Sequence, residues 1–448
     1  MPSDHQASVS ANADRNAQST LIDIGRLRRS NKIPIKIPKA ARFLAADTLA
    51  LVIDKAVGSD SPEDWDRLFY FAPAALALPG PHLRENKSAA TLIKHKLSTF
   101  MHSDPSLLLC ARTSLPVPPK AIPRPEEESS KTKRLRKGVN AKLIEGDISA
   151  AVRLVVSEDT ILQPTDEVLE ALRLKHPEPP ADLLPTPPAI PNQHLSVSTN
   201  DITRAIRSFP ASSSGGIDGL RPGHIKDLTS PRLAEAGIRL ISSITKLVNL
   251  MLNGDLGQYA RDLLFSANLT ALKKKDGGIR PIAVGNIFRR LAAKAICNPA
   301  IKDLSQQLQP IQLGVGVPGG CEVAAHAIRL LASSHCINKG VMVKLDLKNA
   351  FNSVRRDHLL EVCRRRAPSI FPLARLAYGS PSSLLVTEKI IPSSTGVQQG
   401  DPLGPLLFAL AVDDIARSLS SPVNLWYLDD ATLAGPAVRV LTSSFFGS

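Results

Sequence analysis

The segments VMVKLDLKNAF (residues 341–351) and NLWYLDDATLAG (residues 424–435) decide which fold we expect for this chain of 448 residues. In each of them a short apolar run, typical of a β-strand, leads to aspartate: Asp346 in the first segment, Asp429 and Asp430 in the second. The chain between them is long enough for a helix and a strand that would bring the acidic residues together at adjoining strand ends. Carboxylates arranged in this way suit a pair of divalent cations, as nucleotidyl transfer requires.

An Asp-Asp pair alone is weak evidence, because this dipeptide is common in turns and helix caps. The sequence between the two acidic sites makes the pattern more specific. In STGVQQGDPLGPLLFAL (residues 394–410), Gly396 and Gly400 allow close backbone approach, while Gln398 and Gln399 offer amide donors and acceptors. We therefore expect this segment to lie beside the acidic residues.

The surrounding sequence predicts mixed α/β structure. Two β-compatible arms flank Asp276 and Gly277, a dipeptide suited to a hairpin turn. Asp401 followed by Pro402 is expected to start a helix in the favoured cap-then-proline order. Three further helices are predicted at residues 234–252, 286–308 and 322–333; the first would end at Gly254 and bury Ile238, Ile241, Leu247, Val248 and Met251 on one face.

Taken together, the motifs resemble the reverse transcriptase family, most closely the domain of non-LTR retrotransposons. The resemblance covers roughly half of the chain and implies the fingers and palm of a right-hand polymerase, an α/β (α+β) fold. Five blocks carry it, in order along the chain: SSGGIDGLRPGHI (213–225), LKKKDGGIRPIAV (272–284), LDLKNAFNSV (345–354), GVQQGDPLGPLLF (396–408) and WYLDDATLAG (426–435).

The resemblance implies roles for the acidic residues and for the cations of the hairpin. Asp346, Asp429 and Asp430 would be the catalytic and metal-binding carboxylates for two Mg²⁺ or Mn²⁺ ions, with Asp430 as a supporting member, because successive strand residues face opposite ways. Nucleotide-binding residues would be Lys274, Lys275, Arg280, Phe351 and Gln399, since guanidinium and ammonium groups suit phosphate charge. An exposed basic turn is the alternative interpretation of the lysines.

Phe351 matches the position of the family's sugar gate. A bulky ring there would meet a ribose 2′-hydroxyl without offering it a hydrogen bond, so deoxynucleotides would be favoured. A phenylalanine of the core is the alternative interpretation. Template and primer positioning would fall to Gly396, Gln398, Gly400 and Pro402, and the implied partners are an RNA template, a DNA primer and dNTPs.

Composition shifts divide the chain into three expected regions. Residues 1–140 are a helical, partly disordered region of unknown role, and they end in the proline-rich tract at 115–125 and the basic run KTKRLRK at 131–137. A solvated linker is the simplest interpretation of that run, and a nuclear-import signal or phosphate contact is the alternative. Residues 141–192 are a small helical element followed by an extended proline-rich linker, and residues 193–448 are the fingers and palm.

The net charge, the cysteine content and the lengths of the apolar stretches agree with a nucleic-acid partner inside the cell. A formal net charge of +14 favours a polyanion, although a merely basic protein is equally compatible with charge alone. The five cysteines have no zinc-site spacing, so we expect reduced thiols. No apolar stretch approaches the ~20 residues needed to span a bilayer, so we expect an intracellular protein without a membrane partner, in the nucleus or cytoplasm.

Only 18 residues follow Asp430, and they do not resemble the family's continuation. The expectation is therefore an incomplete polymerase whose thumb is missing. Two hypotheses follow: an RNA-directed DNA polymerase impaired by truncation, or an inactive retroelement remnant that at most binds nucleic acid. The sequence leaves the oligomeric state open.

Overall fold

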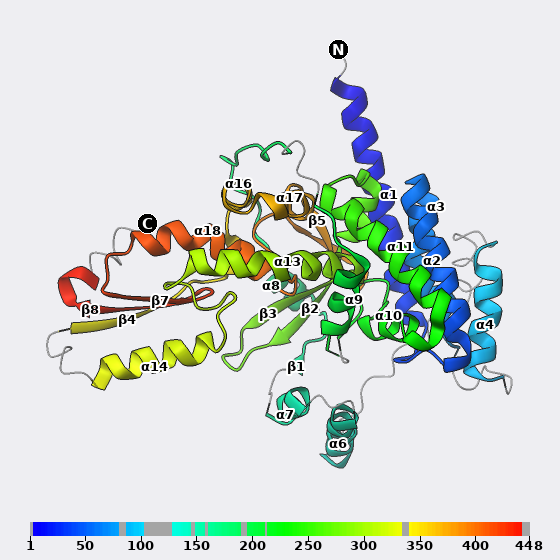
Figure 1. Cartoon of the computed structure of the whole chain (residues 1–448), viewed down its shortest axis with the longest axis horizontal. Helices are drawn as coiled ribbons and strands as arrows, with labels where there is room; N and C mark the ends of the chain where they lie inside the picture. Colours follow the sequence, from blue (N-terminus) through cyan, green and yellow to red (C-terminus); the bar gives the residue numbers. More distant parts are fainter. Residues whose placement is uncertain are drawn as a thin grey trace.

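The computed structural model describes residues 3–79, 87–102, 128–144, 148–156, 160–189, 195–210, 213–333 and 340–440. It has the expected mixed α/β architecture, in which helices surround two small β-sheets (Figure 1). In the described part of the chain, no helix is both long and apolar enough to cross a membrane. Cys297, Cys321 and Cys363 are free thiols, while the other two cysteines lie outside the described residues.

The N-terminal helices form one end of the molecule, where α2 packs against α11 (Ala234–Asn253) (Figure 1). Gly254 ends α11 with a positive φ of 81°, as predicted. The expected apolar face was wrong at Ile238, which is 70% exposed. Positions 240, 244, 247, 248 and 251 face the core instead, and Ile238 lies about half a turn away from them. The helices packed at this end are α1 (Ser3–Ser30), α2 (Arg42–Ser59), α3 (Pro62–Tyr70) and α4 (Ala89–Phe100).

The first sheet is built on the predicted hairpin. Strands β2 (Ala267–Lys273) and β3 (Ile279–Gly285) pair antiparallel along their whole length, and Gly277 takes the positive φ in the loop between them. The start of β2 also pairs with β5 (Ser382–Val386) in parallel, and β5 pairs with β6 (Lys389–Ser393). A two-residue strand, β1 (Thr160–Ile161), pairs with the other end of β2.

The second sheet carries the acidic residues. Its order is β4 (Gly340–Asp346), β8 (Asp430–Pro436) and β7 (Val423–Tyr427), and all pairs are antiparallel. Asp346 lies directly opposite Asp430 in the register. The prediction that the acidic sites occupy adjoining strand ends is therefore confirmed.

The remaining helices connect and cover these sheets. The helices expected at 286–308 and 322–333 are confirmed as α13 and α14, which start at Ile287 and Gly320. With these two, α13 (Ile287–Leu308) and α14 (Gly320–Ser333), the remaining helices are α6 (Glu128–Ile144), α7 (Ile148–Val156), α8 (Asp166–Leu174), α9 (Thr199–Ser208), α10 (Pro222–Leu228), α12 (Gln258–Leu264), α15 (Ala350–Ser353), α16 (Arg356–Arg366), α17 (Phe371–Tyr378) and α18 (Gly404–Ser418).

Two linker predictions had different outcomes. The basic run at 131–137 lies inside helix α6, so a linker there was wrong; lysine and arginine are good helix formers, and charge alone does not prevent a helix. Residues 176–189 have no helix or strand, as their prolines predicted. The tract at 115–125 lies outside the described residues.

One hydrophobic core runs through most of the molecule. It joins side chains of α1 and α2 to side chains of α11, α13 and α18. This core contains side chains from before residue 140 and from after residue 192, the boundaries of the expected regions. The N-terminal helices therefore support the elements that carry the acidic residues. The three expected regions remain a prediction.

Candidate active site

A cavity of about 600 Å³ lies where β3, the end of β4 and the turn between β7 and β8 meet. It brings together most of the residues that the sequence analysis singled out. The predicted site residues among its lining are Lys274, Arg280, Asp346, Phe351, Gln398, Gln399, Gly400, Pro402 and Asp429.

The acidic side of the cavity is formed by Asp346 and Asp429. Asp429 lies in the two-residue turn that joins β7 to β8, and Asp346 ends β4. Burial raises the pKa of Asp429, and the neighbouring carboxylates of Asp430 and Asp346 raise it further, while Lys274 lowers it. Asp430 does not line the cavity and forms an exposed ion pair with Lys344 at 3.3 Å.

The donor set fits a hard divalent cation. Among the residues that the structure describes, no group of three or more His, Cys, Asp or Glu side chains is assembled as a metal site. Mg²⁺, however, usually keeps several waters and takes one or two protein carboxylates together with substrate phosphates. Two crowded carboxylates at the wall of a roomy cavity match that requirement, because a cation would relieve the repulsion that contributes to the raised pKa of Asp429.

The cationic side of the cavity comes from the hairpin. Lys274 lies in the loop after β2, and Arg280 lies on β3 opposite Leu272. Lys275 is not among the residues that line the cavity. Two further lysines do line it, Lys175 and Lys348, and the sequence analysis missed both.

The two missed lysines differ in how visible they were. Lys348 lies two residues after Asp346 in a motif already singled out, so its position was a usable signal. Lys175 has no local signal, because it follows α8 and lies far from every motif of the site in the sequence. The Asn349 side chain donates a hydrogen bond to the Lys175 carbonyl oxygen at 3.0 Å and so holds that segment beside the site.

Phe351 lines the cavity from α15, directly after the strand of Asp346. Its ring stacks on Phe408 of α18, with ring centroids 4.5 Å apart and an interplanar angle of 15°. One part of the ring is thus held by the core while another borders the cavity. The geometry is compatible with both interpretations of this residue, the gate and the core.

Gly396 and Gly400 make the close approaches that their sequence predicted. A Cβ on Gly396 would lie 2.2 Å from the Phe351 carbonyl oxygen, and one on Gly400 would lie 2.5 Å from the Ala283 carbonyl oxygen; both glycines have positive φ. The Ala283 N–H also donates to the Gln399 carbonyl oxygen at 2.8 Å. These contacts join the loop to both the Phe351 segment and the hairpin.

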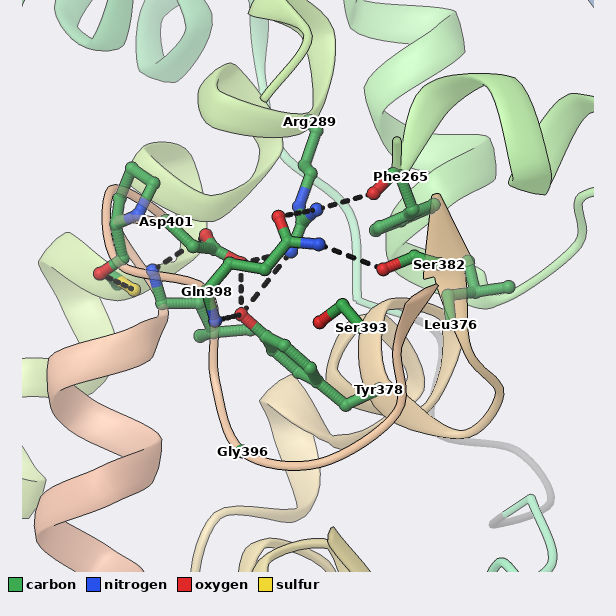
Figure 2. A network of polar contacts seen from close by, with 12 residues as sticks. Phe265, Arg289, Leu376, Tyr378, Ser382, Ser393, Gly396, Gln398 and Asp401 are labelled. Atoms are coloured by element: carbon green, nitrogen blue, oxygen red, sulfur yellow. Dashed lines mark hydrogen bonds and ion pairs between the residues drawn. The ribbon is translucent and has the colours of Figure 1, made fainter. Parts of the chain in front are cut away.

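A buried polar network holds the same loop from behind (Figure 2). Arg289 of α13 forms an ion pair with Asp401 at 2.6 Å, and both side chains are 2% exposed. Arg289 also donates to the Gln398 side-chain oxygen and to the Phe265 carbonyl oxygen, each at 2.7 Å. The Tyr378 hydroxyl donates to Asp401 at 2.6 Å. Burial would lower the pKa of Arg289, but Asp401 and Tyr378 outweigh it, and the pKa is raised.

The network changes two expectations. The Gln398 amide also donates to the Ser382 hydroxyl at 2.8 Å, so its polar atoms are occupied inside the protein. Helix α18 begins at Gly404 and not directly after Asp401, so the cap-then-proline prediction was wrong. The Asp401 carboxylate instead accepts from the Leu403 N–H and from Arg289, because the buried guanidinium needs an anionic partner. Arg289 carried no motif and was missed.

Comparison with known proteins points to one family. Residues 272–440 match the family model described as reverse transcriptase (RNA-dependent DNA polymerase). This range begins at the end of β2 and includes the hairpin loop, β3 and all the acidic residues of the cavity.

Two relatives give longer matches. The chain is 27% identical over 266 residues to the retrotransposable element SLACS 132 kDa protein of Trypanosoma brucei gambiense, covering 57% of this chain and 22% of that protein. It is 30% identical over 242 residues to the retrovirus-related Pol polyprotein from type-2 retrotransposable element R2DM of Drosophila melanogaster, covering 51% and 21%. The matched region thus spans about a fifth of the length of these relatives.

A solved structure of apo telomerase from Candida tropicalis, truncated from the C-terminal domain, aligns with 94% of this chain and 90% of its own. The identity is 10% and the TM-score 0.30, a likeness on which we base no conclusion.

Proposed function

We propose that this chain, which carries a reverse transcriptase domain homologous to the proteins of non-LTR retrotransposons, is an RNA-directed DNA polymerase. Membership of the reverse transcriptase family implies that activity. One observation carries the proposal for this chain: Asp346 and Asp429 share a cavity with Lys274, Arg280 and Phe351. Carboxylates, phosphate-binding cations and an aromatic residue are the groups that a template-directed transfer of deoxynucleotides needs.

Asp346 and Asp429 would hold two Mg²⁺ or Mn²⁺ ions, and Asp430 would support them from the neighbouring strand position. Bound there, the ions would activate the primer's 3′-hydroxyl and neutralise charge on the phosphates. Since Asp346 and Asp430 are register partners, we expect the carboxylates of Asp346 and Asp429 to lie within about 8 Å of each other. They would orient the reacting groups by holding fixed positions at two adjoining strand ends.

Lys274 and Arg280 would hold the incoming triphosphate, and Lys275 would add charge from the same loop. Their support is the position of the hairpin, whose cations share the cavity with the acidic residues. Charge-assisted hydrogen bonds from guanidinium and ammonium groups to phosphate are among the stronger polar contacts in proteins. Lys348 is a further candidate for the same task, because it lines the cavity two residues after Asp346. Gln399 would contact the nucleotide from the loop beside β3, since it lines the cavity and its carbonyl oxygen accepts from the Ala283 N–H.

Phe351 would select deoxynucleotides. Its ring is braced by Phe408 and borders the cavity, so it could not move away without losing that stacking. A ribose 2′-hydroxyl placed against the ring would lose water and gain no hydrogen bond.

Template and primer would be positioned by the loop that contains Gly396, Gly400 and Pro402. Gln398 would act there indirectly, because its amide is bonded to Arg289 and Ser382. The proposed partners are an RNA template, a DNA primer and dNTPs, and the proposed place of action is intracellular, in the nucleus or cytoplasm. The net charge of +14 supports binding to a polyanion that weakens as salt rises.

The deciding experiment is primer extension on an RNA template with Mg²⁺ and dNTPs. Asp429→Asn should abolish synthesis, because the amide keeps the size of the carboxylate but not its charge. Asp414→Asn is the matched control, since Asp414 is 55% exposed and forms a surface ion pair with Arg365. Synthesis that survives Asp429→Asn would contradict the proposal. Salt-sensitive binding of primer-template without any synthesis would favour the alternative, a nucleic-acid-binding protein.

A further inference from the structure

The turn that presents Asp429 contains a residue in an unfavourable backbone conformation. Leu428, the first of its two loop residues, has a φ of 56°. This left-handed region is open to glycine, but a branched side chain rarely adopts it, because its Cβ approaches the backbone carbonyl oxygen. Another part of the fold must therefore hold Leu428 there, and Asp429 with it.

A single side chain satisfies both backbone groups of Leu428. Gln312 accepts a hydrogen bond from the Leu428 N–H through its Oε1 atom at 2.8 Å. Its Nε2 atom donates to the Leu428 carbonyl oxygen at 3.3 Å. Gln312 comes from the segment between α13 and α14, more than 100 residues away in the sequence, and it is only 3% exposed.

The segment that carries Gln312 is itself fixed to the strand before the turn. The Leu313 N–H donates to the Trp426 carbonyl oxygen at 2.7 Å, and the Trp426 N–H donates to the Ile311 carbonyl oxygen at 2.8 Å. Gln312 thus forms an isolated parallel β-bridge with Trp426 of β7. The Gly314 N–H donates to Gln312 Oε1 at 2.9 Å, which sets the direction of the amide.

The same segment also packs closely against the turn. A Cβ on Gly314 would lie 2.8 Å from both the Leu428 nitrogen and its Cγ atom. The backbone at Gly314 therefore packs directly against Leu428 while Gln312 bonds it from the side. Two independent contacts, one polar and one steric, act on the residue next to Asp429.

We infer that Gln312 is a positioning residue that sets the orientation of Asp429 by holding Leu428 in its left-handed conformation. The inference rests on the proposed function for its consequence, because the orientation of Asp429 matters to metal binding and synthesis. The contacts of Gln312 with Leu428 are independent of the proposed function. A catalytic group displaced by about 1 Å can lose about a hundredfold in rate, so a turn under this strain needs such support.

The test compares Gln312→Leu with Gln306→Leu. Gln306 lies on the exposed face of α13, so the control makes the same chemical change away from the turn. Mn²⁺ binding to the full chain is titrated by electron paramagnetic resonance, and primer extension is measured in parallel. Gln312→Leu should weaken Mn²⁺ binding by about tenfold or more and lower kcat more than it raises the KM for dNTP. Gln306→Leu should match the wild type in both assays.

A second variant separates positioning from general stability. In a Leu428→Gly background the left-handed conformation no longer needs to be held, so adding Gln312→Leu should weaken Mn²⁺ binding far less than it does in the wild type. Equal losses in both backgrounds, or unchanged Mn²⁺ binding in Gln312→Leu, would overturn the inference. If Mn²⁺ binding depends on Gln312 as expected but the wild type makes no DNA, the proposed function fails and the inference stands. If the wild type binds no Mn²⁺ and makes no DNA, both fail.

Discussion

Replacing Arg289 with methionine should remove a large part of the protein's stability. Methionine roughly fills the volume of the arginine stem but leaves the Asp401 carboxylate buried without its cation. It also leaves the Gln398 side-chain oxygen and the Phe265 carbonyl oxygen without the hydrogen bonds that Arg289 donates (Figure 2). Breaking a buried ion pair by removing one partner costs about 3–5 kcal/mol. Because domains are typically stable by about 5–15 kcal/mol, this single change should bring the chain close to unfolding.

The assay is urea unfolding followed by circular dichroism, with the free energy of unfolding compared between wild type and Arg289→Met. Two control variants are measured in the same way. Arg364→Met removes an exposed ion pair with Glu361 and should have no measurable effect. The double variant Arg289→Met with Asp401→Asn should recover part of the loss, because no uncompensated charge remains buried. A loss below about 1 kcal/mol for Arg289→Met would refute the reasoning, since it would mean that the Asp401 carboxylate is not isolated by burial.

Three further predictions concern separate parts of the molecule. Phe351→Val should raise the kcat/KM for ribonucleotides relative to deoxynucleotides by roughly tenfold or more, and an unchanged ratio would count against a gate at this position. Gly400→Ala should cost about 1–3 kcal/mol in urea unfolding, because its Cβ would lie 2.5 Å from the Ala283 carbonyl oxygen at a φ of 121°; a stable variant would show that the loop can yield. Asp66 is partly buried and accepts a hydrogen bond from the Tyr259 hydroxyl, and burial raises its pKa to about 6. In the unfolded chain the Asp66 carboxyl ionises at a lower pH than in the folded protein. The contribution of Asp66 to stability should therefore be fully present below about pH 4 and decline by about 1–3 kcal/mol towards pH 6. Asp66→Asn should remove that part of the decline, and an identical pH profile in the variant would contradict the shift.

Contacts between distant segments explain why the wrong and missed assignments fall where they do. Asp401 precedes a proline, which is a local signal for a helix start, and yet the nearest guanidinium decides what its carboxylate binds. Arg289 lies in a helical stretch with nothing in its neighbourhood to distinguish it from the adjacent Arg290. Ile238 is apolar within a correctly predicted helix, but the side on which the helix is covered depends on α2 and its neighbours. Each of these outcomes depends on a partner distant in the sequence.

The sequence by itself determined the elements of the candidate site. The apolar runs that end at Asp346 and Asp429, and the turn at Gly277, follow from local rules of strand length and backbone conformation, and the structure places them as predicted. Four of the five motifs lie within residues 272–440, which match the reverse transcriptase model, because the spacing of residue types along the chain is itself a property of the sequence.

Only the tertiary structure decided what holds that site in place. The bond from Asn349 that brings Lys175 to the cavity, the guanidinium of Arg289 behind the glycine loop, and the Gln312 amide bonded to Leu428 all join segments that are far apart in the chain. No periodicity or motif encodes such pairs, because a hydrogen bond depends on the distance and direction between two atoms, and those are set only when the whole core has packed.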